Sequence, residues 1–377
     1  MLIPKQLLLS YGTDDERARI ILGTDDMRFS LLWSWPLLVP AALFTLLLAI
    51  VMPQPAPIRK DRLFTLSDGR RIAYEIRGNP AAKNVVFWNH GIISSRYEVM
   101  STNEDLLEEL DMVLVGIDRP CYGGSDPHPA RTFKSYAEDL AALADYLKAA
   151  QFFVVGVSGG GPYAYAAAYY LPDRVRGVMT ISTLAPSGTM KAQEEGKYFA
   201  EMDSVGVAIT RLFRRHIFMA SLVHAAARSS LGGRALFYAF LRPIAKNCLS
   251  LMAEVDRKCI EEEHREYTDL IVPESLRQGT SAMFFEDLYL FEQPWEFDVR
   301  NIRPEVQRSI HIWHGTGDKQ VPWVAAEVLH RLMPAAHLHI VKGGGHFAYY
   351  VCDKKKQREA LEALLKSAAP LKNTAES

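Results

Sequence analysis

The sequence has few cysteines, little net charge and no metal-binding pattern. Basic and acidic residues nearly balance, at 43 against 44, and the basic residues are dispersed along the 377-residue chain. Because binding to nucleic-acid phosphates needs concentrated positive charge, we expect no nucleic-acid partner. The cysteines form no CxxC pair and no Cys/His pair at metal-ligand spacing, so they predict reduced, mostly buried thiols and no metal site. These cysteines are Cys121, Cys248, Cys259 and Cys352.

One segment lacks charge altogether. No charged residue occurs over residues 29–52, and the uncharged stretch continues to Ile58. As a helix, 24 residues reach about 36 Å, which is enough to cross a hydrocarbon core of about 30 Å. Trp33 and Trp35 lie near one end, as in an interfacial aromatic belt. A signal peptide fits poorly because the preceding stretch is long and acidic, and a buried hairpin remains the alternative. The segment predicts a single-pass helix in membrane lipid.

The residues around this segment predict its orientation and the domain organisation. More basic residues follow the segment than precede it within about 20 residues, so we expect the large C-terminal part to face the cytosol. The prolines of residues 53–57 predict a stiff linker. The predicted parts are an N-terminal extension over 1–28, the membrane helix over 29–52, a linker over 53–61, an α/β core over 62–185 and 297–367, a helical cap over 186–296, and a loose tail over 368–377.

Short apolar runs alternate with helical patterns along most of the chain. An opening hairpin is predicted because two strand-like runs flank the turn residues 67–70. The alternation stops over residues 186–294, where helical runs rich in Met and Phe predict an insertion. We therefore expect a mostly parallel sheet wrapped by helices, with a helical cap. The predicted strands are 62–66, 71–76, 85–88, 112–117, 152–157, 175–182, 309–313 and 337–341; the clearest predicted helices are 97–110, 133–149, 323–332 and 354–365.

Ser158 stands among glycines where a predicted strand meets a predicted helix. In that context a serine can sit on a sharp, strained turn with its hydroxyl projecting from the sheet. A serine hydroxyl is a poor nucleophile by itself, so a base and an orienting acid must lie nearby. Asp318 and His346 each follow the end of a predicted strand, where ligands meet a parallel sheet. We expect these three side chains to converge.

Other residues compete for each of these roles. Ser158 alone could be a small residue at a helix N-terminus. Asp318 could be a turn residue, and the rival acids Glu286 and Asp287 lie within the predicted cap. His346 is favoured because it lies in a glycine-rich loop, whereas its rivals alternate with apolar residues inside predicted strands. These rivals are His311, His314, His337 and His339.

Five motifs in this order resemble the α/β-hydrolase family over residues 63–365: residues 89–91, 118–126, 156–160, 314–318 and 343–347. The resemblance implies an α/β-hydrolase fold with no cofactor, in which Ser158 is the nucleophile, His346 the general base and acid, and Asp318 the residue that orients the imidazole. It also implies an oxyanion hole formed by the backbone N–H groups of Ile92 and Gly159. The residues expected to shape this site are His90, Gly91, Gly156 and Gly160.

Cys121 departs from the family pattern, since related sequences usually carry glycine in DRPGYG. It could narrow the pocket or alter a turn, and the sequence leaves both open. Asp118 and Arg119 are expected to hold a loop, without touching substrate.

The functional expectation is a membrane-anchored serine hydrolase that cleaves an ester or related acyl bond of an apolar substrate through an acyl-enzyme. Serine at position 158 argues against epoxide hydrolases and haloalkane dehalogenases of this fold, which use aspartate there. Two alternatives stay open. One is a ligand receptor with slow turnover, because the fold hosts both uses. The other is a C–C hydrolase or cofactor-free peroxidase that uses the same triad.

Overall fold

The computed structural model describes residues 61–369, apart from residues 129, 216–221, 223–224, 227–228, 242–247 and 281. The predicted N-terminal extension, the predicted membrane helix and almost all of the predicted linker lie outside the described residues. Within the described ranges, no helix has both the length and the apolar character that crossing a membrane requires.

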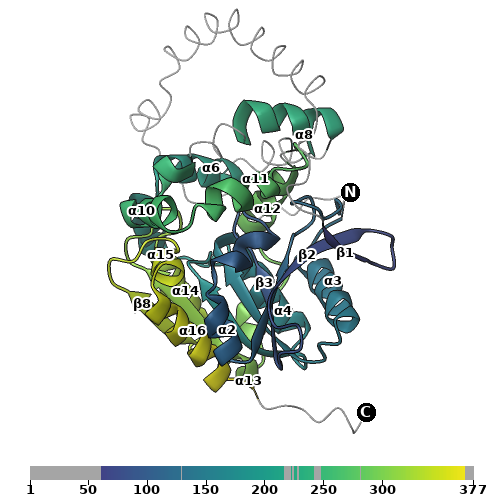
Figure 1. Ribbon diagram of the computed structural model, residues 1–377. Coiled ribbons are helices and arrows are strands. Elements are labelled where there is room, and N and C mark those ends of the chain that lie inside the picture. Colours follow the sequence, from purple (N-terminus) through teal and green to yellow (C-terminus); the bar gives the residue numbers. More distant parts are fainter. Residues whose placement is uncertain are drawn as a thin grey trace, which may run out of the picture. The chain divides into compact units, whose positions relative to one another are not determined.

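The described strands form a single eight-stranded sheet in the order β1-β2-β4-β3-β5-β6-β7-β8 (Figure 1). β1 and β4 both pair antiparallel with β2, and every later pair is parallel. The predicted opening hairpin and mostly parallel sheet are therefore confirmed. The strands are β1 (Arg62–Thr65), β2 (Arg71–Gly78), β3 (Asn84–Asn89), β4 (Met112–Ile117), β5 (Phe152–Val157), β6 (Val175–Ile181), β7 (Ile310–Gly315) and β8 (His337–Val341).

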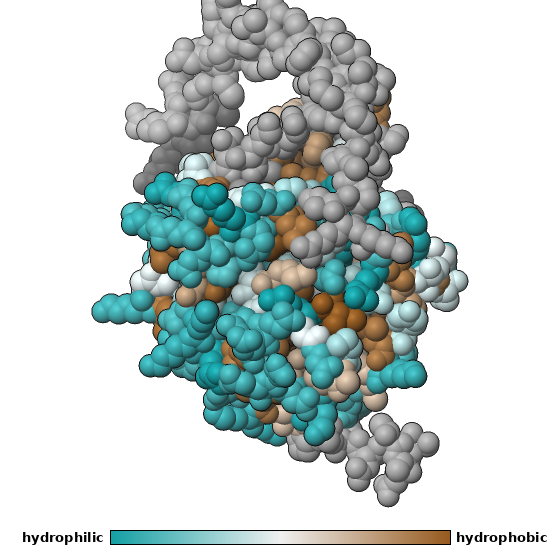
Figure 2. Space-filling model, in the orientation of Figure 1, coloured by the Kyte–Doolittle hydropathy of each residue, from teal (hydrophilic) through white to brown (hydrophobic). Residues whose placement is uncertain are grey.

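Helices cover both faces of this sheet. β4 and β5 are buried along their whole length, and successive residues such as Val86 and Phe87 belong to separate apolar clusters. Side chains alternate between the two faces of a strand, so these clusters are the cores on either side of the sheet. The first contains residues of α3 (Phe133–Tyr146), α4 (Gly161–Tyr170) and α14 (Val324–Leu332), and the second contains residues of α2 (Glu104–Glu109) and α16 (Lys354–Lys366). The visible surface is largely hydrophilic, with small apolar patches (Figure 2).

One predicted helix is wrong as a continuous element. Residues 97–110 form a 3₁₀ helix, η1 (Arg96–Ser101), followed by α2. The chain becomes extended between them, and the Asn103 side chain accepts a hydrogen bond from the Leu106 N–H at 3.1 Å. An asparagine in this position starts a new helix because it satisfies an N–H group that lacks an intrahelical acceptor.

The chain between β6 and β7 contains helices and, among its described residues, no strand. The name cap is kept for residues 186–296 of this segment. Its α6, α10 and α12 lie together on one side of the sheet (Figure 1). The elements from β6 to β7 are α5 (Ala192–Glu201), α6 (Ser204–Arg215), α8 (Ser230–Leu236), the π-helix η3 (Phe237–Leu241), η4 (Cys248–Leu251), α10 (Glu254–Glu262), the π-helix η5 (Tyr267–Ile271), α11 (Val272–Ser275), α12 (Ala282–Glu292), η6 (Val299–Asn301) and α13 (Pro304–Gln307).

Two of the cysteines contradict the prediction of reduced thiols. Cys259 in α10 and Cys352, directly after α15 (Ala348–Val351), form a disulfide across 93 positions, with Cα atoms 6.0 Å apart. The sequence carried no sign of this pair, because only the packing of α10 beside α15 brings the two residues together. A disulfide across a long stretch of chain typically stabilises by about 2–4 kcal/mol, since it restricts the unfolded state. Cys121 is a free, buried thiol, as expected.

Candidate active site

Ser158 lies at the junction of β5 and α4 with a positive φ of 51°. A non-glycine residue in this left-handed region costs about 1–3 kcal/mol, so the surrounding structure must impose it. Neighbouring glycines allow the turn: a Cβ on Gly156 would lie 2.6 Å from the Gly160 carbonyl oxygen, and one on Gly160 would lie 2.0 Å from the Asn89 carbonyl oxygen. The predicted sharp turn is therefore present, with the geometry of a nucleophile elbow.

Asp318 and His346 follow the neighbouring strands β7 and β8, and their side chains are joined. The His346 Nδ1 lies 2.7 Å from the Asp318 Oδ2, and both residues are buried. The other carboxylate oxygen of Asp318 accepts the N–H groups of Gln320 at 2.9 Å and Val321 at 3.0 Å. These bonds fix the carboxylate, which in turn fixes the orientation of the imidazole ring.

Burial and pairing act in opposite directions on this pair. Burial raises the pKa of Asp318, but His346 and His314 lower it by more, so the pKa lies well below the ordinary value. Burial lowers the pKa of His346, whereas the charge and hydrogen bond of Asp318 raise it by more, and the net shift is upward. Asp318 is therefore ionised at neutral pH, and the His346 ring is well placed to accept a proton.

A cavity of about 200 Å³ joins the serine and the histidine, since Ser158 and His346 both line it. Most of its wall is apolar and comes from the cap, including Ile209 of α6 and Phe284 and Leu288 of α12. Among the described residues, no hydrogen bond links the Ser158 hydroxyl to the His346 ring. Such contacts are often long before a substrate binds.

The loop after β3 borders the same cavity through Gly91, Ile92 and Ile93. A Cβ on Gly91 would lie 3.5 Å from the Ser158 Cβ, and one on Gly159 would lie 2.7 Å from the Ile92 Cγ1. Gly159 is the second residue of the short 3₁₀ helix η2 (Ser158–Gly160), where the first N–H groups have no intrahelical acceptor. The backbone segments of Ile92 and Gly159 are therefore next to each other at Ser158.

His90 and Arg119 hold this loop from the protein interior. The His90 Nδ1 lies 2.7 Å from the Gly91 carbonyl oxygen, and its Nε2 accepts the Arg119 N–H at 3.3 Å. Burial and the nearby Arg119 charge keep the pKa of His90 well below its ordinary value, so the ring is neutral. The Arg119 side chain donates to the carbonyl oxygens of His90 and Gly91. Both residues thus contact the loop after β3.

The rival acids Asp287 and Glu286 lie on α12 and attach this helix to neighbouring elements. The Asp287 carboxylate, fully buried, accepts hydrogen bonds from Arg119, Tyr122 and Tyr163, each at 2.7 Å. It also pairs with Arg131 at 3.0 Å, and Glu286 lies 3.5 Å from the same guanidinium. This network joins α12 to the loop after β4 and to α4.

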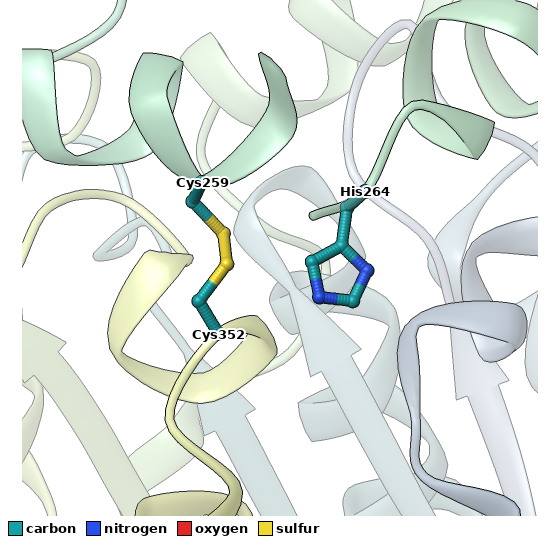
Figure 3. Close-up of side chains that lie close together, drawn as sticks. All are labelled: Cys259, His264 and Cys352. Carbon is teal, nitrogen blue, oxygen red and sulfur yellow. A yellow bond between two sulfur atoms is a disulfide. The ribbon is translucent and has the colours of Figure 1, made fainter. Parts of the chain in front are cut away.

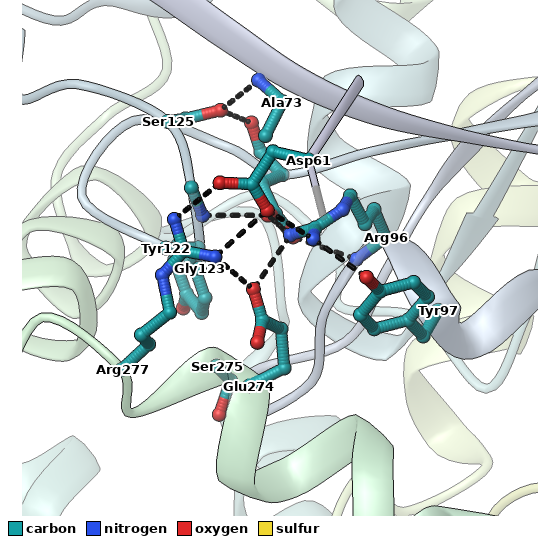
Figure 4. A network of polar contacts seen from close by, with 12 residues as sticks. Asp61, Ala73, Arg96, Tyr97, Tyr122, Gly123, Ser125, Glu274, Ser275 and Arg277 are labelled. Atoms are coloured by element: carbon teal, nitrogen blue, oxygen red, sulfur yellow. Dashed lines mark hydrogen bonds and ion pairs between the residues drawn. The ribbon is translucent and has the colours of Figure 1, made fainter. Parts of the chain in front are cut away.

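A second buried network surrounds Arg96 and joins η1, the turn after β4 and α11 (Figure 4). The guanidinium lies 2.8 Å from Glu274 and 2.7 Å from Asp61, and it also pairs with Asp118. Burial lowers the pKa of Arg96, but Asp118 and Glu274 raise it by more, so the cation is retained. Asp118 also accepts the Gly124 N–H at 2.9 Å, which is the loop-holding role that the sequence predicts.

Cys121 adopts a φ of 69°, in the left-handed region that favours glycine. The residue therefore keeps a backbone conformation suited to the glycine of related sequences, and its side chain packs in an apolar cluster without lining the cavity at Ser158. Burial raises the pKa of the Cys121 thiol to about 12, so this cysteine is an unreactive, packed side chain.

Asp256, a fully buried residue of α10, also contacts the site, and no sequence pattern indicated it. Its carboxylate accepts the backbone N–H groups of His346 at 2.7 Å, Phe347 at 3.0 Å and Ala348 at 2.9 Å. A Cβ on Gly345 would lie 2.2 Å from the Asp256 Oδ2, so a glycine is needed there. The cap therefore holds the loop that carries His346. Acidic residues are common on α10, and only packing distinguishes this one.

Two further buried residues, Glu98 and His314, lie beside the site. Glu98 lines the cavity and accepts from the Trp88 indole and the Ser94 hydroxyl at 2.7 Å, and from the Gly91 N–H at 3.3 Å. Burial raises its pKa. His314, expected to be a packed or surface residue, is fully buried; its Nε2 lies 2.7 Å from the Val321 carbonyl oxygen and 3.3 Å from the Asp318 Oδ2.

Among the described residues, side chains that could ligate a metal ion cluster at one place, and that place lies outside this cavity. Cys259, His264 and Cys352 form that group, whereas Ser158, Asp318 and His346 offer no such cluster.

Two solved structures and one curated protein illustrate what the chain is similar to. A thermophilic esterase from Thermogutta terrifontis is 19% identical, with 83% of this chain and 100% of that chain covered at a TM-score of 0.55. A bromoperoxidase from Bacillus anthracis is 20% identical, with 81% and 100% covered at a TM-score of 0.54. A poly(3-hydroxyalkanoate) depolymerase from Ectopseudomonas oleovorans is 31% identical over 137 residues, which cover 36% of this chain and 46% of that protein.

The structural neighbours show the fold, and the chain spans just under half the length of the curated relative. The match to a protein family covers more of the chain. Residues 85–354 match the alpha/beta hydrolase family, and they include the serine turn, the Asp318–His346 pair and the whole cap. The chain belongs to the alpha/beta hydrolase family.

Proposed function

We propose that this protein is a serine hydrolase that cleaves an ester or related acyl bond of an apolar substrate. The observation that carries the proposal is the meeting of a strained Ser158 and an Asp318-bound His346 at one apolar cavity. A nucleophile, a base and an acid that orients the base, brought together at one site, are the requirements of acyl transfer through a covalent intermediate.

In the proposed mechanism, Ser158 attacks the substrate carbonyl carbon while the His346 Nε2 takes the hydroxyl proton. Asp318, bound to Nδ1, keeps the Nε2 available and stabilises the imidazolium that forms. The N–H groups of Ile92 and Gly159 stabilise the oxyanion, and one such donor contributes about 2.7–4 kcal/mol. His346 then protonates the leaving group, and a water activated by His346 releases the acid from the acyl-enzyme.

The substrate class follows from the cavity wall. Apolar side chains from the cap dominate it, and such a wall stabilises a bound hydrocarbon chain because its surface leaves water. Two of the similar proteins are an esterase and a poly(3-hydroxyalkanoate) depolymerase, names that refer to esters and polyesters. An apolar carboxylic ester is therefore the proposed substrate.

The test combines active-site labelling with turnover. A fluorophosphonate should label the wild type and Ser67→Ala, whose serine is exposed in the opening hairpin, but not Ser158→Ala. Wild type should hydrolyse chromogenic esters with a preference for longer acyl chains, and Ser158→Ala should lose about 10⁴-fold or more in kcat.

Three outcomes would contradict parts of the proposal. Undiminished labelling of Ser158→Ala would remove the nucleophile assignment. Tight ligand binding with stoichiometric labelling and no turnover would favour the receptor alternative. Hydrolysis of short esters together with failure on every long-chain ester would remove the apolar substrate.

Membrane anchoring is proposed from the sequence of residues 29–52, which lie outside the described residues. The full chain should stay with membranes after alkaline carbonate extraction, whereas a chain that starts at residue 53 should not. Protease protection of sealed vesicles then tests the expected cytosolic side. Release of the full chain by carbonate would overturn the anchor.

A further inference from the structure

A cluster of soft metal ligands lies where the cap meets the chain after His346. The Sγ atoms of Cys259 and Cys352 and a ring nitrogen of His264 all lie within 4.8 Å of one another (Figure 3). Cys259 is on α10, His264 follows the same helix, and Cys352 follows α15. Neither the sequence motifs nor the hydrolase chemistry uses these three residues.

His264 is oriented as a metal-binding histidine would be. Its Nδ1 lies 2.7 Å from the Glu266 Oε1, and the Nε2 side of the ring faces the two sulfur atoms (Figure 3). A carboxylate on one ring nitrogen fixes the tautomer and makes the other nitrogen a better ligand, as in carboxylate–histidine–zinc arrangements. The cluster thus has both ligands and a residue that orients one of them.

We propose that the reduced protein binds one zinc-like divalent cation through the Sγ atoms of Cys259 and Cys352 and the Nε2 of His264. Two thiolates and an imidazole suit Zn²⁺, whose fourth tetrahedral position would be filled by water. His264 and Cys352 are partly exposed, which provides a path of entry. The site is separate from the Ser158 cavity, so the proposal does not depend on the proposed function.

The disulfide and the metal are alternative states of this site. A dithiol reductant supplies two electrons and two protons, so that the Cys259–Cys352 bond becomes two thiols while the reductant becomes a disulfide. The cation then displaces the thiol protons, so its affinity rises with pH. A cytosolic location would favour the dithiol form, and an oxidising compartment would favour the disulfide.

Either state connects α10 to the chain beyond His346. Cys259 lies three residues after Asp256, so both side chains lie on the same face of α10. Asp256 binds the backbone of residues 346–348, and Cys352 lies one short helix further along. A cation would therefore replace the covalent link that reduction breaks.

The experiment is a Co²⁺ titration of the full chain in detergent after reduction with a phosphine and removal of the reductant without oxygen. We expect one equivalent to produce a thiolate-to-Co²⁺ charge-transfer band and the visible bands of tetrahedral Co²⁺, both displaced by Zn²⁺. The oxidised protein should produce neither. Buried Cys121, with its raised pKa, should not contribute.

Variants separate this site from adventitious binding. Cys352→Ser and His264→Ala should lose the tetrahedral spectrum, and Glu266→Gln should weaken Co²⁺ binding by about 10–100-fold. Glu263→Gln, which changes an exposed carboxylate beside His264, is the matched control and should bind as wild type does. His264→Ala retains both cysteines, so its melting temperature in the oxidised form reports whether it is folded.

Three results would overturn the proposal. They are a reduced wild type with no thiolate charge-transfer band, a band that survives Cys352→Ser, and a weak octahedral spectrum that is the same in the reduced and oxidised proteins. The last result would mean that surface carboxylates bind the cation.

Discussion

The turn that carries Ser158 and the loop that carries His346 are held in different ways. The serine turn depends on backbone packed against backbone, because glycines at 156 and 160 let β3, β5 and α4 approach closely. The histidine loop depends on side chains of the cap, namely the Asp256 carboxylate and the Cys259–Cys352 disulfide. Both deliver a side chain to the same cavity.

The serine turn and the histidine loop should therefore differ in how strongly a single substitution affects them. A backbone contact cannot relax without moving strands, whereas a side-chain contact can be altered by one substitution in the cap. Changes in the cap can therefore affect the base without affecting the nucleophile, and the predictions below test this asymmetry.

The largest effect is expected on the histidine side. Asp318→Asn should lower kcat by about 10⁴-fold, because the imidazole loses its orientation and the stabilisation of its cation. Loss of the Asp318 charge should also lower the pKa of His346, which Asp318 raises, so the acid limb of the pH–rate profile should move to lower pH. Steady-state rates across pH measure both effects. An unchanged limb would show that Asp318 does not act on His346.

Two glycine substitutions compare the two kinds of support directly. Gly160→Ala should destabilise by several kcal/mol, because its Cβ would meet the Asn89 backbone, which cannot move away. Gly345→Ala should also destabilise, but its Cβ would meet the Asp256 side chain. Urea unfolding measures both changes.

A double variant provides the control for this comparison. Asp256→Ala should partly rescue Gly345→Ala, because it removes the atoms that clash, whereas it should do nothing for Gly160→Ala. Equal behaviour of both glycine variants in the Asp256→Ala background would show that the histidine loop is as rigidly supported as the serine turn.

A smaller effect is expected from Asp256→Asn. The charge-assisted bonds to the loop weaken, and we expect kcat to fall about 10–100-fold. The Asp256 charge also raises the pKa of His346, so the acid limb should move to lower pH, though less than in Asp318→Asn. Glu261→Gln, an exposed change on the same helix, should alter neither. A fall in rate with an unmoved limb would assign Asp256 a purely structural role.

The smallest effect concerns stability against pH. Since the folded protein raises the pKa of His346 above 6.5, this residue binds a proton more tightly in the folded state. Its contribution to stability is therefore complete below 6.5 and is lost as pH rises through the folded-state pKa. His346→Gln should remove that slope from the urea unfolding free energy, and Ser158→Ala should retain it. Identical slopes in all three proteins would contradict the upward shift.

The strands were largely predictable because buried parallel strands are short, continuous apolar runs. The run 152–157 coincides with β5, and the run 112–117 with β4. The interruption of the predicted helix over 97–110 was not predictable from the sequence. The hydrophobic spacing continues across the point where Asn103 caps a new helix. Likewise Glu98 and Asp256 resemble ordinary helix-surface acids until packing buries them.

The sequence by itself determined the order of the strands and helices and the glycine-flanked turn at Ser158, because these follow from hydrophobic periodicity and from the space a Cβ needs. Only the tertiary structure decided which acid holds the His346 loop, which cysteines pair and which face of the cap lines the cavity. Those contacts join residues about 90 positions apart, and local patterns carry no information on which distant side chains will meet.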